Sequence, residues 1–279
     1  MSMRFRDSVT WVTGASSGIG EAAARQFHAE GAHLVLSARN DADLQRVADD
    51  LDGLKGPGEI FVMPFDVTDQ AAVSAAAGSV LDRFGRVDVL LNNAGLTQRA
   101  RVVDTDLAVF QAVMDVNFFG PLMLTKAVLP SMLTRGSGQI VCTTSVAGKY
   151  GSPMRSGYNA AKHAVHGFFD SLREEVAAAG IDVTLIVPGA VRTNVSINAL
   201  RGDGSRYNRM DSFLENGMPP EECARRALDA IHARKREVLI ADGVARRDVF
   251  LKRWSPALLT WLMRRRKPAP RTIPADRTT

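Results

Sequence analysis

Tyr158 and Lys162, in the stretch "YNAAK", are spaced so that they could exchange a proton. Residues four apart share one face of a helix, so the phenol and the ammonium can meet there. An ordinary phenol, with a pKa near 10, is a poor proton donor or acceptor at neutral pH. A nearby ammonium stabilises the phenolate and makes the phenol a usable acid–base group. Because the same spacing is common in surface pairs, the prediction needs support from other residues.

Two polar residues upstream could complete a site around this pair. Ser145 ends an apolar stretch thirteen residues before Tyr158, and its hydroxyl can hold a substrate carbonyl oxygen near the phenol. It lacks the G-x-S-x-G context of a nucleophilic serine. Asn117 lies in a helical stretch just before a Gly-Pro pair. Since proline removes a helical hydrogen bond, we expect a kink there that frees a carbonyl to hold a water near Lys162.

Three glycines, Gly14, Gly18 and Gly20, lie between an apolar strand and an alanine-rich helix. The first permits a tight turn, the second lets phosphates approach the backbone, and the third lets the helix pack close to the sheet. The helix N-terminus offers free N–H groups and partial positive charge to an anion, and Ser16 and Ser17 add hydroxyl donors. The pattern predicts a dinucleotide site; the alternative is a glycine-rich connection that binds nothing.

Residues after the second and third strands favour NADP over NAD as the cofactor. An NAD site usually has an acid after the second strand to bond the adenine ribose, but Ala38 occupies that position and Arg39 follows. A guanidinium can bond a 2′-phosphate bidentately, although a solvated surface arginine is the alternative. Asp66, after the third strand, can reach the adenine amino group, and Asp69 is expected to cap the next helix. The "NNAG" stretch, residues 92–95, follows the fourth strand at the same sheet edge.

Short apolar segments and helical segments alternate along the chain and must position these residues. The expected strands are 8–14, 33–39, 59–67, 87–93, 138–145, 181–189 and 237–241. The expected helices are 21–31, 42–53, 69–85, 107–134, 158–179 and 221–236. Strands that are apolar on both faces indicate a covered parallel sheet. We therefore predict a single α/β domain over residues 1–245, a three-layer Rossmann-type doubly wound parallel sheet of about seven strands. The irregular stretch 190–218 is typical of a functional loop or lid.

Composition excludes several other classes. The two cysteines, Cys142 and Cys223, have no neighbours at metal-ligand spacing, so we expect neither a disulfide scaffold nor a metal site. No signal peptide opens the chain and no run of 18 apolar residues appears, which predicts a cytoplasmic protein. The net charge is +5, but residues 246–279 carry ten basic and two acidic side chains, so the body is slightly negative. A nucleic-acid partner is therefore not expected.

The basic C-terminal segment has two possible partners. In residues 246–267, tryptophans and leucines alternate with basic clusters, and Pro256 is expected to divide the segment into two short helices. Such a helix suits the interface of an anionic membrane, with the protein peripheral to it. The alternative, given equal weight, is that protein covers the apolar face of this segment. Residues 268–279 are expected to be disordered.

Taken together, the motifs resemble those of the short-chain dehydrogenase/reductase family. The stretches "TGASSGIG", "NNAG", "YNAAK" and "PGAVRT" occur in the family's order over roughly residues 8–240. Within the family, residues 155–175, 191–207 and 235–243 are similar to the branch of members 7 and 7B. The resemblance implies hydride transfer between a nicotinamide and a carbonyl or secondary alcohol, with a catalytic tetrad and a homodimer or homotetramer. The implied tetrad is Asn117, Ser145, Tyr158 and Lys162.

With this resemblance, the predicted cofactor site extends to the end of the sixth strand. Its residues are Gly14, Ser16, Ser17, Gly18, Ile19, Gly20, Arg39, Asn40, Asp66, Val67, Asn93, Ala94, Gly95, Tyr158, Lys162, Pro188, Gly189, Val191 and Thr193. The predicted substrate contacts are Ser145, Tyr158, Gln98, Val146, Tyr150 and Ile197. Arg155 and Arg201 could steer an anionic substrate or stay solvated. The rival hypothesis is a sensor or scaffold that binds NADP without turnover, but such a protein has no need of the tetrad.

Overall fold

The computed structural model describes residues 3–54 and 56–266, which form a seven-stranded parallel sheet covered by helices. The strands, in the spatial order β3-β2-β1-β4-β5-β6-β7, are β1 (Val9–Thr13), β2 (His33–Ser37), β3 (Ile60–Val62), β4 (Val89–Asn92), β5 (Gly138–Thr143), β6 (Ile181–Pro188) and β7 (Glu237–Ile240). The helices are α1 (Gly18–Ala29), α2 (Asp41–Asp52), α3 (Gln70–Phe84), α4 (Leu107–Met114), α5 (Gly120–Arg135), α6 (Ser156–Val176), α7 (Ser212–Glu215), α8 (Pro220–His232), α9 (Gly243–Trp254) and α10 (Pro256–Arg265). The Rossmann-type fold predicted from the alternating segments is confirmed.

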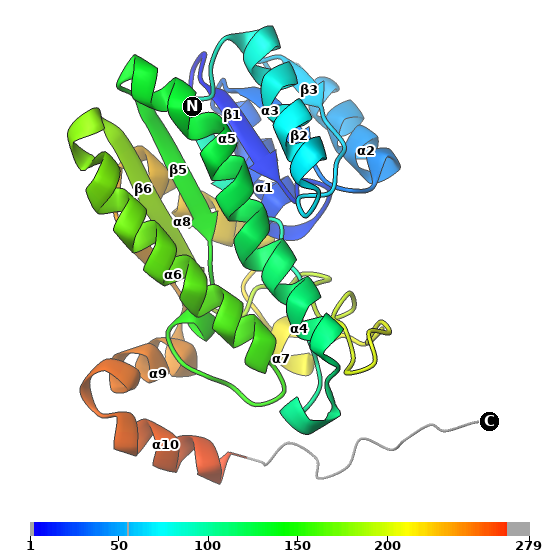
Figure 1. The fold of residues 1–279 in the computed structure, drawn as a ribbon, viewed down its shortest axis with the longest axis vertical. Coiled ribbons are helices and arrows are strands. Elements are labelled where there is room, and N and C mark those ends of the chain that lie inside the picture. The colour runs from blue at the N-terminus through cyan, green and yellow to red at the C-terminus, as the bar shows by residue number, and fades with distance from the viewer. Residues whose placement is uncertain (1–2, 55, 267–279) are drawn as a thin grey trace.

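The sheet is buried on both faces, which explains its continuous apolar strands. Trp11 of β1 pairs with Val35 of β2 and Leu90 of β4, and all three side chains are fully buried. The helices α1, α2 and α8 cover one face, and α3, α5 and α6 cover the other (Figure 1). Each face has its own apolar cluster, so the molecule has three layers with the sheet in the middle.

The helix expected over residues 107–134 is interrupted near its middle. It consists of α4, a π-helical turn at Asp115–Phe119 (η2), and α5. The stretch Leu107–Arg135 has no unbroken run of 18 apolar residues, but an 18-residue window within it has a mean hydropathy of 1.5, so by length and composition alone it is apolar enough to cross a membrane. In the structure it packs on α3, β5 and α6. It is thus one of the helices that cover the sheet.

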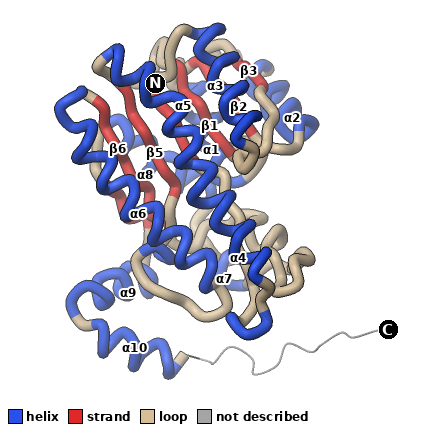
Figure 2. Tube along the Cα trace, in the orientation of Figure 1, coloured by secondary structure: helices blue, strands red, loops and turns tan. Residues whose placement is uncertain are grey.

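The carboxyl ends of the strands carry the irregular part of the molecule. The segment 190–218, which contains the short helix α7, lies beyond this edge, and loops gather there (Figure 2). The helices α9 and α10 extend past the same end of the sheet (Figure 1). The break between them is at Ser255, just before Pro256, as expected from that proline. The tail predicted to be disordered, residues 268–279, lies outside the described residues.

Candidate active site

The turn between β1 and α1 has the geometry that only glycine permits. Gly14 and Gly18 have φ angles of +65° and +58°, in the left-handed region that side chains disfavour. A Cβ on Gly20 would lie 2.1 Å from the Gly14 carbonyl oxygen, so a side chain there would displace the turn. A Cβ on Gly18 would lie 3.0 Å from Thr193 Cγ2, which places the segment after β6 against this turn. The turn leaves the start of α1 open to an anion.

The loop after β4 is tied to the glycine turn by hydrogen bonds. The Thr13 hydroxyl oxygen accepts from the backbone N–H groups of Asn93 (3.0 Å) and Ala94 (3.1 Å). The Asn93 side-chain amide donates to the Thr13 carbonyl at 3.2 Å. Asn93 therefore fixes the distance between the two loops that border the predicted cofactor site. Sequence analysis missed Thr13, although its position directly before Gly14 was a usable signal.

Arg39, two residues after the end of β2, is accessible to a ligand. Its side chain is 70% exposed, and its Nη1 lies 4.0 Å from an Asp66 carboxylate oxygen. Asn40 caps α2 by accepting from the backbone N–H of Asp43. A second guanidinium, that of Arg46, donates to the Ser16 carbonyl at 3.1 Å. The charge of Arg46 is paired with Glu21 and Asp50, so this side chain ties α2 to the glycine turn. The contact was not predicted, because it depends on how α2 lies against that turn.

The reactive groups lie beyond β5. Lys162 is buried, and its Nζ donates to the Thr143 carbonyl at 2.8 Å and lies 5.7 Å from the centre of the Tyr158 ring. Both residues come from the first turns of α6, as their spacing predicts. Ser145 follows β5, and its hydroxyl oxygen accepts from the Ala147 N–H at 3.1 Å. The ammonium is thus held beside the phenol at the carboxyl end of the sheet.

Asn117 lies inside the π-helical turn and is completely buried. Its side-chain amide donates to the carbonyls of Leu96 (2.6 Å) and Val113 (2.7 Å), and its Oδ1 lies 3.4 Å from the Leu96 N–H. The side chain is therefore fully used in joining the loop after β4 to this turn. π-Turns inserted in α-helices are frequent at functional sites, and this one is the distortion that the sequence predicts near Asn117.

A cavity of about 1000 Å³ joins these parts. The residues of the predicted cofactor set that line it are Gly14, Ser16, Ser17, Gly18, Ile19, Arg39, Asn40, Asp66, Val67, Asn93, Ala94, Gly95, Tyr158, Lys162, Pro188, Gly189, Val191 and Thr193. Gly20 lies behind the turn, where its close contact with Gly14 fits the packing role expected of it. Ser145 also lines the cavity. The predicted site residues thus converge on one cavity from both halves of the sheet.

Four predicted substrate contacts do not line this cavity. Gln98 is buried, and its Oε1 accepts from the Gly157 N–H at 2.8 Å, so it holds the start of α6. Val146 is buried in a small apolar cluster, and Tyr150 packs against that cluster. Ile197 accepts a backbone hydrogen bond from Asn208 within the segment 190–218. None of the four is in the cavity lining, and Gln98 is the one whose side chain is seen to support a site element, the start of α6.

Sequence analysis named Arg155 as a possible anion contact but missed the charged cluster that it forms with Arg99 and Asp211. Arg99 and Arg155 both bond the carboxylate of Asp211, Arg99 at 2.8 Å from Nε and Arg155 at 3.4 Å from Nη2. Arg206 lines the same cavity. Arg201, the other predicted steering residue, does not. These groups come from three separate segments, so no local sequence motif predicts the cluster.

Neither cysteine has a place in the chemistry. Cys142 and Cys223 are buried free thiols, and burial raises the pKa of each to about 12. Within residues 3–54 and 56–266, no group of three or more histidine, cysteine, aspartate or glutamate side chains could hold a metal ion.

The fold and the cavity define a nicotinamide-dependent oxidoreductase of the Rossmann type. The family model described as short chain dehydrogenase matches residues 8–203, and the chain belongs to the short-chain dehydrogenase/reductase family. Its relatives include dehydrogenase/reductase SDR family member 7B of Mus musculus, 44% identical over 261 residues, or 92% of this chain and 80% of that protein. The 7-like protein of Drosophila melanogaster is 40% identical over 260 residues, with the same coverage of both chains.

Solved structures with the same fold contain either cofactor. A short-chain dehydrogenase/reductase from Burkholderia phymatum in complex with NAD matches with a TM-score of 0.80 at 25% identity, covering 97% of this chain and 99% of that one. A metagenomic short-chain oxidoreductase in complex with NADP matches with a TM-score of 0.71 at 29% identity, covering 86% and 100%. The fold therefore binds a nicotinamide cofactor, and the choice between the two depends on this chain's own residues.

Proposed function

We propose that the protein is an NADPH-dependent reductase of carbonyl compounds that uses Ser145, Tyr158 and Lys162. The observation that carries this proposal is the convergence of these three side chains and the glycine turn on one cavity. A bound nicotinamide supplies the hydride for reduction or accepts it in the reverse reaction. The reaction is the interconversion of a carbonyl and a secondary alcohol.

The residues present fit a nicotinamide dinucleotide. The glycine turn lines the cavity with Gly14 and Gly18 and opens the start of α1 to a pyrophosphate, and a side chain at Gly20, behind the turn, would displace it. Pro188, Gly189, Val191 and Thr193 border the cavity beyond the end of β6 and would hold the carboxamide end. Asp66 and the neighbouring Val67 would hold the adenine end. The donors are therefore distributed along the whole length of a dinucleotide.

Arg39 supports NADP as the preferred cofactor. Its guanidinium is exposed at the end of β2, and the preceding residue is Ala38 instead of an acid. A carboxylate there would repel a 2′-phosphate, whereas the guanidinium attracts it. The nearby Arg46 is paired with Glu21 and Asp50, which leaves the exposed Arg39 to bond the 2′-phosphate.

The roles of the reactive side chains follow from their positions. Ser145 and Tyr158 hold the substrate carbonyl oxygen, and the Tyr158 hydroxyl donates its proton to the forming alkoxide. Lys162, whose ammonium donates to the Thr143 carbonyl, stabilises the resulting phenolate and would also hold the nicotinamide ribose. Asn117 keeps the π-helical turn in place, where a backbone carbonyl would hold the water that relays the replacement proton.

A carbonyl panel with NADPH and NADH tests the proposal. We expect carbonyl-dependent oxidation of NADPH, with a higher kcat/KM than for NADH, and loss of this activity in Tyr158→Phe. A protein that binds NADPH but oxidises it with no member of a broad ketone and aldehyde panel would support the rival hypothesis, a sensor or scaffold.

The C-terminal helices support a peripheral contact with an anionic membrane. Phe250, Trp254, Leu258 and Trp261 are exposed on α9 and α10, next to arginine and lysine side chains. Arg266, at the end of α10, bonds the buried carboxylate of Asp248 on α9 at 2.6 Å, which ties the two helices together, and Ala245 and Val249 of α9 pack against the domain. Exposed tryptophan with basic neighbours is suited to a membrane interface. Sedimentation with anionic and zwitterionic vesicles, on full-length protein and a Trp254→Ser, Trp261→Ser double variant, tests this contact.

We also propose a homodimer or homotetramer, formed through the helical stretch 107–135 and α6. Phe119 and Leu133 on this stretch are exposed, although the stretch is apolar enough to be buried. Light scattering coupled to gel filtration measures the assembly state, and a monomer at micromolar concentration would contradict it.

A further inference from the structure

The positive charge inside the cavity exceeds what the neighbouring carboxylate balances. Arg99 and Arg155 share the single carboxylate of Asp211, and Arg206 lines the same cavity. The side chains of Arg99, Arg155 and Asp211 are 7%, 24% and 20% exposed, so all three are mostly removed from water. Two guanidinium groups on one carboxylate leave a net charge of about +1 in a partly desolvated place, which an anion would compensate.

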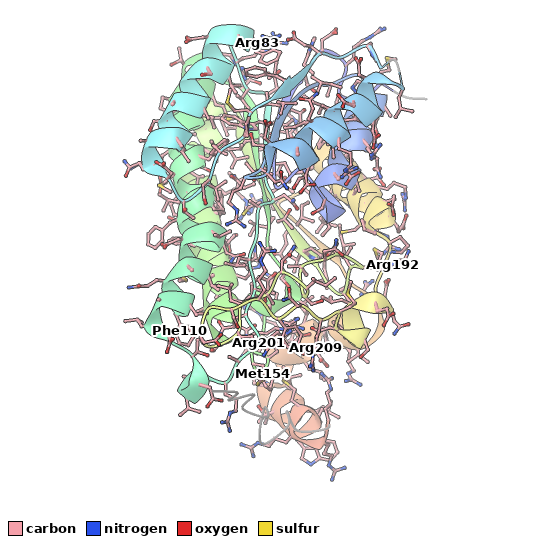
Figure 3. All side chains as sticks on the ribbon, turned by 90° about the vertical axis from the view of Figure 1, so that its right-hand side faces the viewer. Arg83, Phe110, Met154, Arg192, Arg201 and Arg209 are labelled. Carbon is pink, nitrogen blue, oxygen red and sulfur yellow. The ribbon has the colours of Figure 1, made fainter. Side chains whose placement is uncertain are left out.

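This cluster lies at the Tyr158 end of the cavity. Arg155 directly precedes α6, three residues before Tyr158, and the two side chains interact electrostatically. Arg99 belongs to the loop after β4, and Asp211 precedes α7 in the segment 190–218. Figure 3 shows that Met154, the neighbour of Arg155, lies at the same end of the molecule as Arg201 and Arg209 of that segment, far from Arg83.

Arg155 has the weaker hold on the shared carboxylate. Arg99 bonds Asp211 through Nε at 2.8 Å and through Nη2 as well, whereas Arg155 has one contact at 3.4 Å. Burial, with the charge of Arg99, lowers the pKa of Arg155, which indicates that its charge is not fully compensated. The other carboxylates of the lining are Asp43 and Asp66, on the Arg39 side, and Asp115 on the π-helical turn.

We propose that Arg155, assisted by Arg99 and Arg206, binds an anionic group of the substrate, a carboxylate or a phosphate monoester, while Ser145 and Tyr158 hold its carbonyl. This inference rests on the proposed reductase function and adds the class of substrate: ketones or aldehydes with a negative charge near the reacting carbon. A guanidinium matches the planar, bidentate geometry of either anion. The cofactor's own phosphates lie elsewhere in the proposal, at the glycine turn and Arg39.

Matched ketone pairs test the proposal. The first pair is 4-oxopentanoate and its methyl ester, and the second is hydroxyacetone phosphate and hydroxyacetone. In the wild-type protein with NADPH, we expect kcat/KM for the charged member of at least one pair to exceed that of the neutral member by about tenfold or more. The pair with the larger ratio distinguishes a carboxylate site from a phosphate site.

Variants assign the preference to Arg155. We expect Arg155→Met to bring the ratio to within about threefold of unity, mainly through KM for the charged ketone, and Arg155→Lys to restore part of it. Arg209→Met is the matched control, because Arg209 lies on the segment 190–218 beside Asp211 and is exposed but does not line the cavity. It should retain the wild-type ratio. Thermal unfolding of each variant checks that the fold is kept.

Binding measurements separate this proposal from the reductase function. Calorimetry uses Tyr158→Phe protein with NADP⁺ and the charged ketones, with and without Arg155→Met. Binding of a charged ketone that needs Arg155, without turnover in the wild-type protein, would overturn the reductase function and keep the anion site. Equal kcat/KM values within both pairs, an unchanged ratio in Arg155→Met, or failure of every charged ketone to bind would overturn the anion site.

Discussion

The two ends of the cavity are built by different means. At the cofactor end, the contacts come from backbone geometry: the left-handed Gly14 and Gly18 and the open start of α1. At the Tyr158 end, they come from side chains that three distant segments bring together, such as Arg99, Arg155 and Asp211. Backbone groups of this kind suit a phosphate, which many ligands have in common. Side chains that converge from distant segments can discriminate between substrates. The proposed cofactor end therefore depends mainly on the fold, whereas the other end depends on side chains of this chain.

The largest expected effect separates chemistry from cofactor binding. Tyr158→Phe removes the proton donor but none of the groups at the glycine turn. We expect kcat to fall by about 10³-fold, within the range for loss of a general acid, while the NADPH dissociation constant changes less than about threefold. Stopped-flow absorbance and NADPH fluorescence measure the two quantities. A variant that keeps a tenth of the wild-type kcat would show that the phenol is not the proton donor.

A variant of the glycine turn should weaken NADPH binding without removing a reactive side chain. A Cβ in Gly20→Ala would lie 2.1 Å from the Gly14 carbonyl oxygen, so the turn must move away from its binding geometry. We expect NADPH to bind at least about thirtyfold more weakly, which fluorescence titration measures. The matched control is Gly78→Ala in α3, where a Cβ meets nothing within 4 Å. That control should bind NADPH normally and gain roughly 0.4–1 kcal/mol of stability.

Arg39 tests how the cofactor end chooses between two ligands. Arg39→Ala removes the exposed guanidinium expected to bond the 2′-phosphate. We predict that kcat/KM for NADPH falls about 10- to 100-fold relative to that for NADH, the range for one charge-assisted bond. Arg83→Ala, in the last turn of α3 and outside the cavity lining, is the control and should leave the ratio unchanged (Figure 3). An unaltered ratio in Arg39→Ala would remove the basis for the NADP preference.

The smallest effect concerns the scaffold behind the Tyr158 end. His166 on α6 is buried against Gly148, and burial together with Lys149 lowers its pKa to about 4. Glu237 lies 3.5 Å from its Nδ1 but is paired with Lys149. Because the unfolded chain takes up this proton near pH 6.5 and the folded chain only near 4, stability falls as pH drops between these values.

Chemical denaturation at pH 7 and pH 5 measures this loss. We expect His166 to contribute about 2 kcal/mol to the decrease in unfolding free energy between the two values. Burial also lowers the pKa of His28, so the comparison must be made between wild type and His166→Asn. The variant should have a shallower pH dependence, and an identical slope would contradict the assignment.

The two ends of the cavity also differ in how well the sequence predicts them. The glycine turn was predictable because its requirement is local: Gly14, Gly18 and Gly20 lie within seven residues. The distortion at Asn117 was predictable for the same reason, since Gly120 and Pro121 follow it within four residues. The parallel sheet followed from strands that are apolar on both faces.

The substrate end was not predictable, because its geometry depends on how the segment 190–218 folds over the cavity. Gln98 has the polarity of a substrate contact, but its side chain bonds the Gly157 N–H and supports α6. Arg201 and Arg206 are alike in type and close in sequence, yet only Arg206 lines the cavity. Side-chain direction in an irregular segment has no periodicity that a sequence pattern could reveal.

A crystal structure of the protein with NADP⁺ tests the central claim most directly, because it locates both ends of the cavity relative to one ligand. The account predicts the 2′-phosphate at Arg39, the pyrophosphate at the glycine turn, and the nicotinamide ring beside the Tyr158 hydroxyl, with Lys162 Nζ bonded to the ribose. A dinucleotide bound outside this cavity, or a Tyr158 hydroxyl directed away from the nicotinamide, would contradict it.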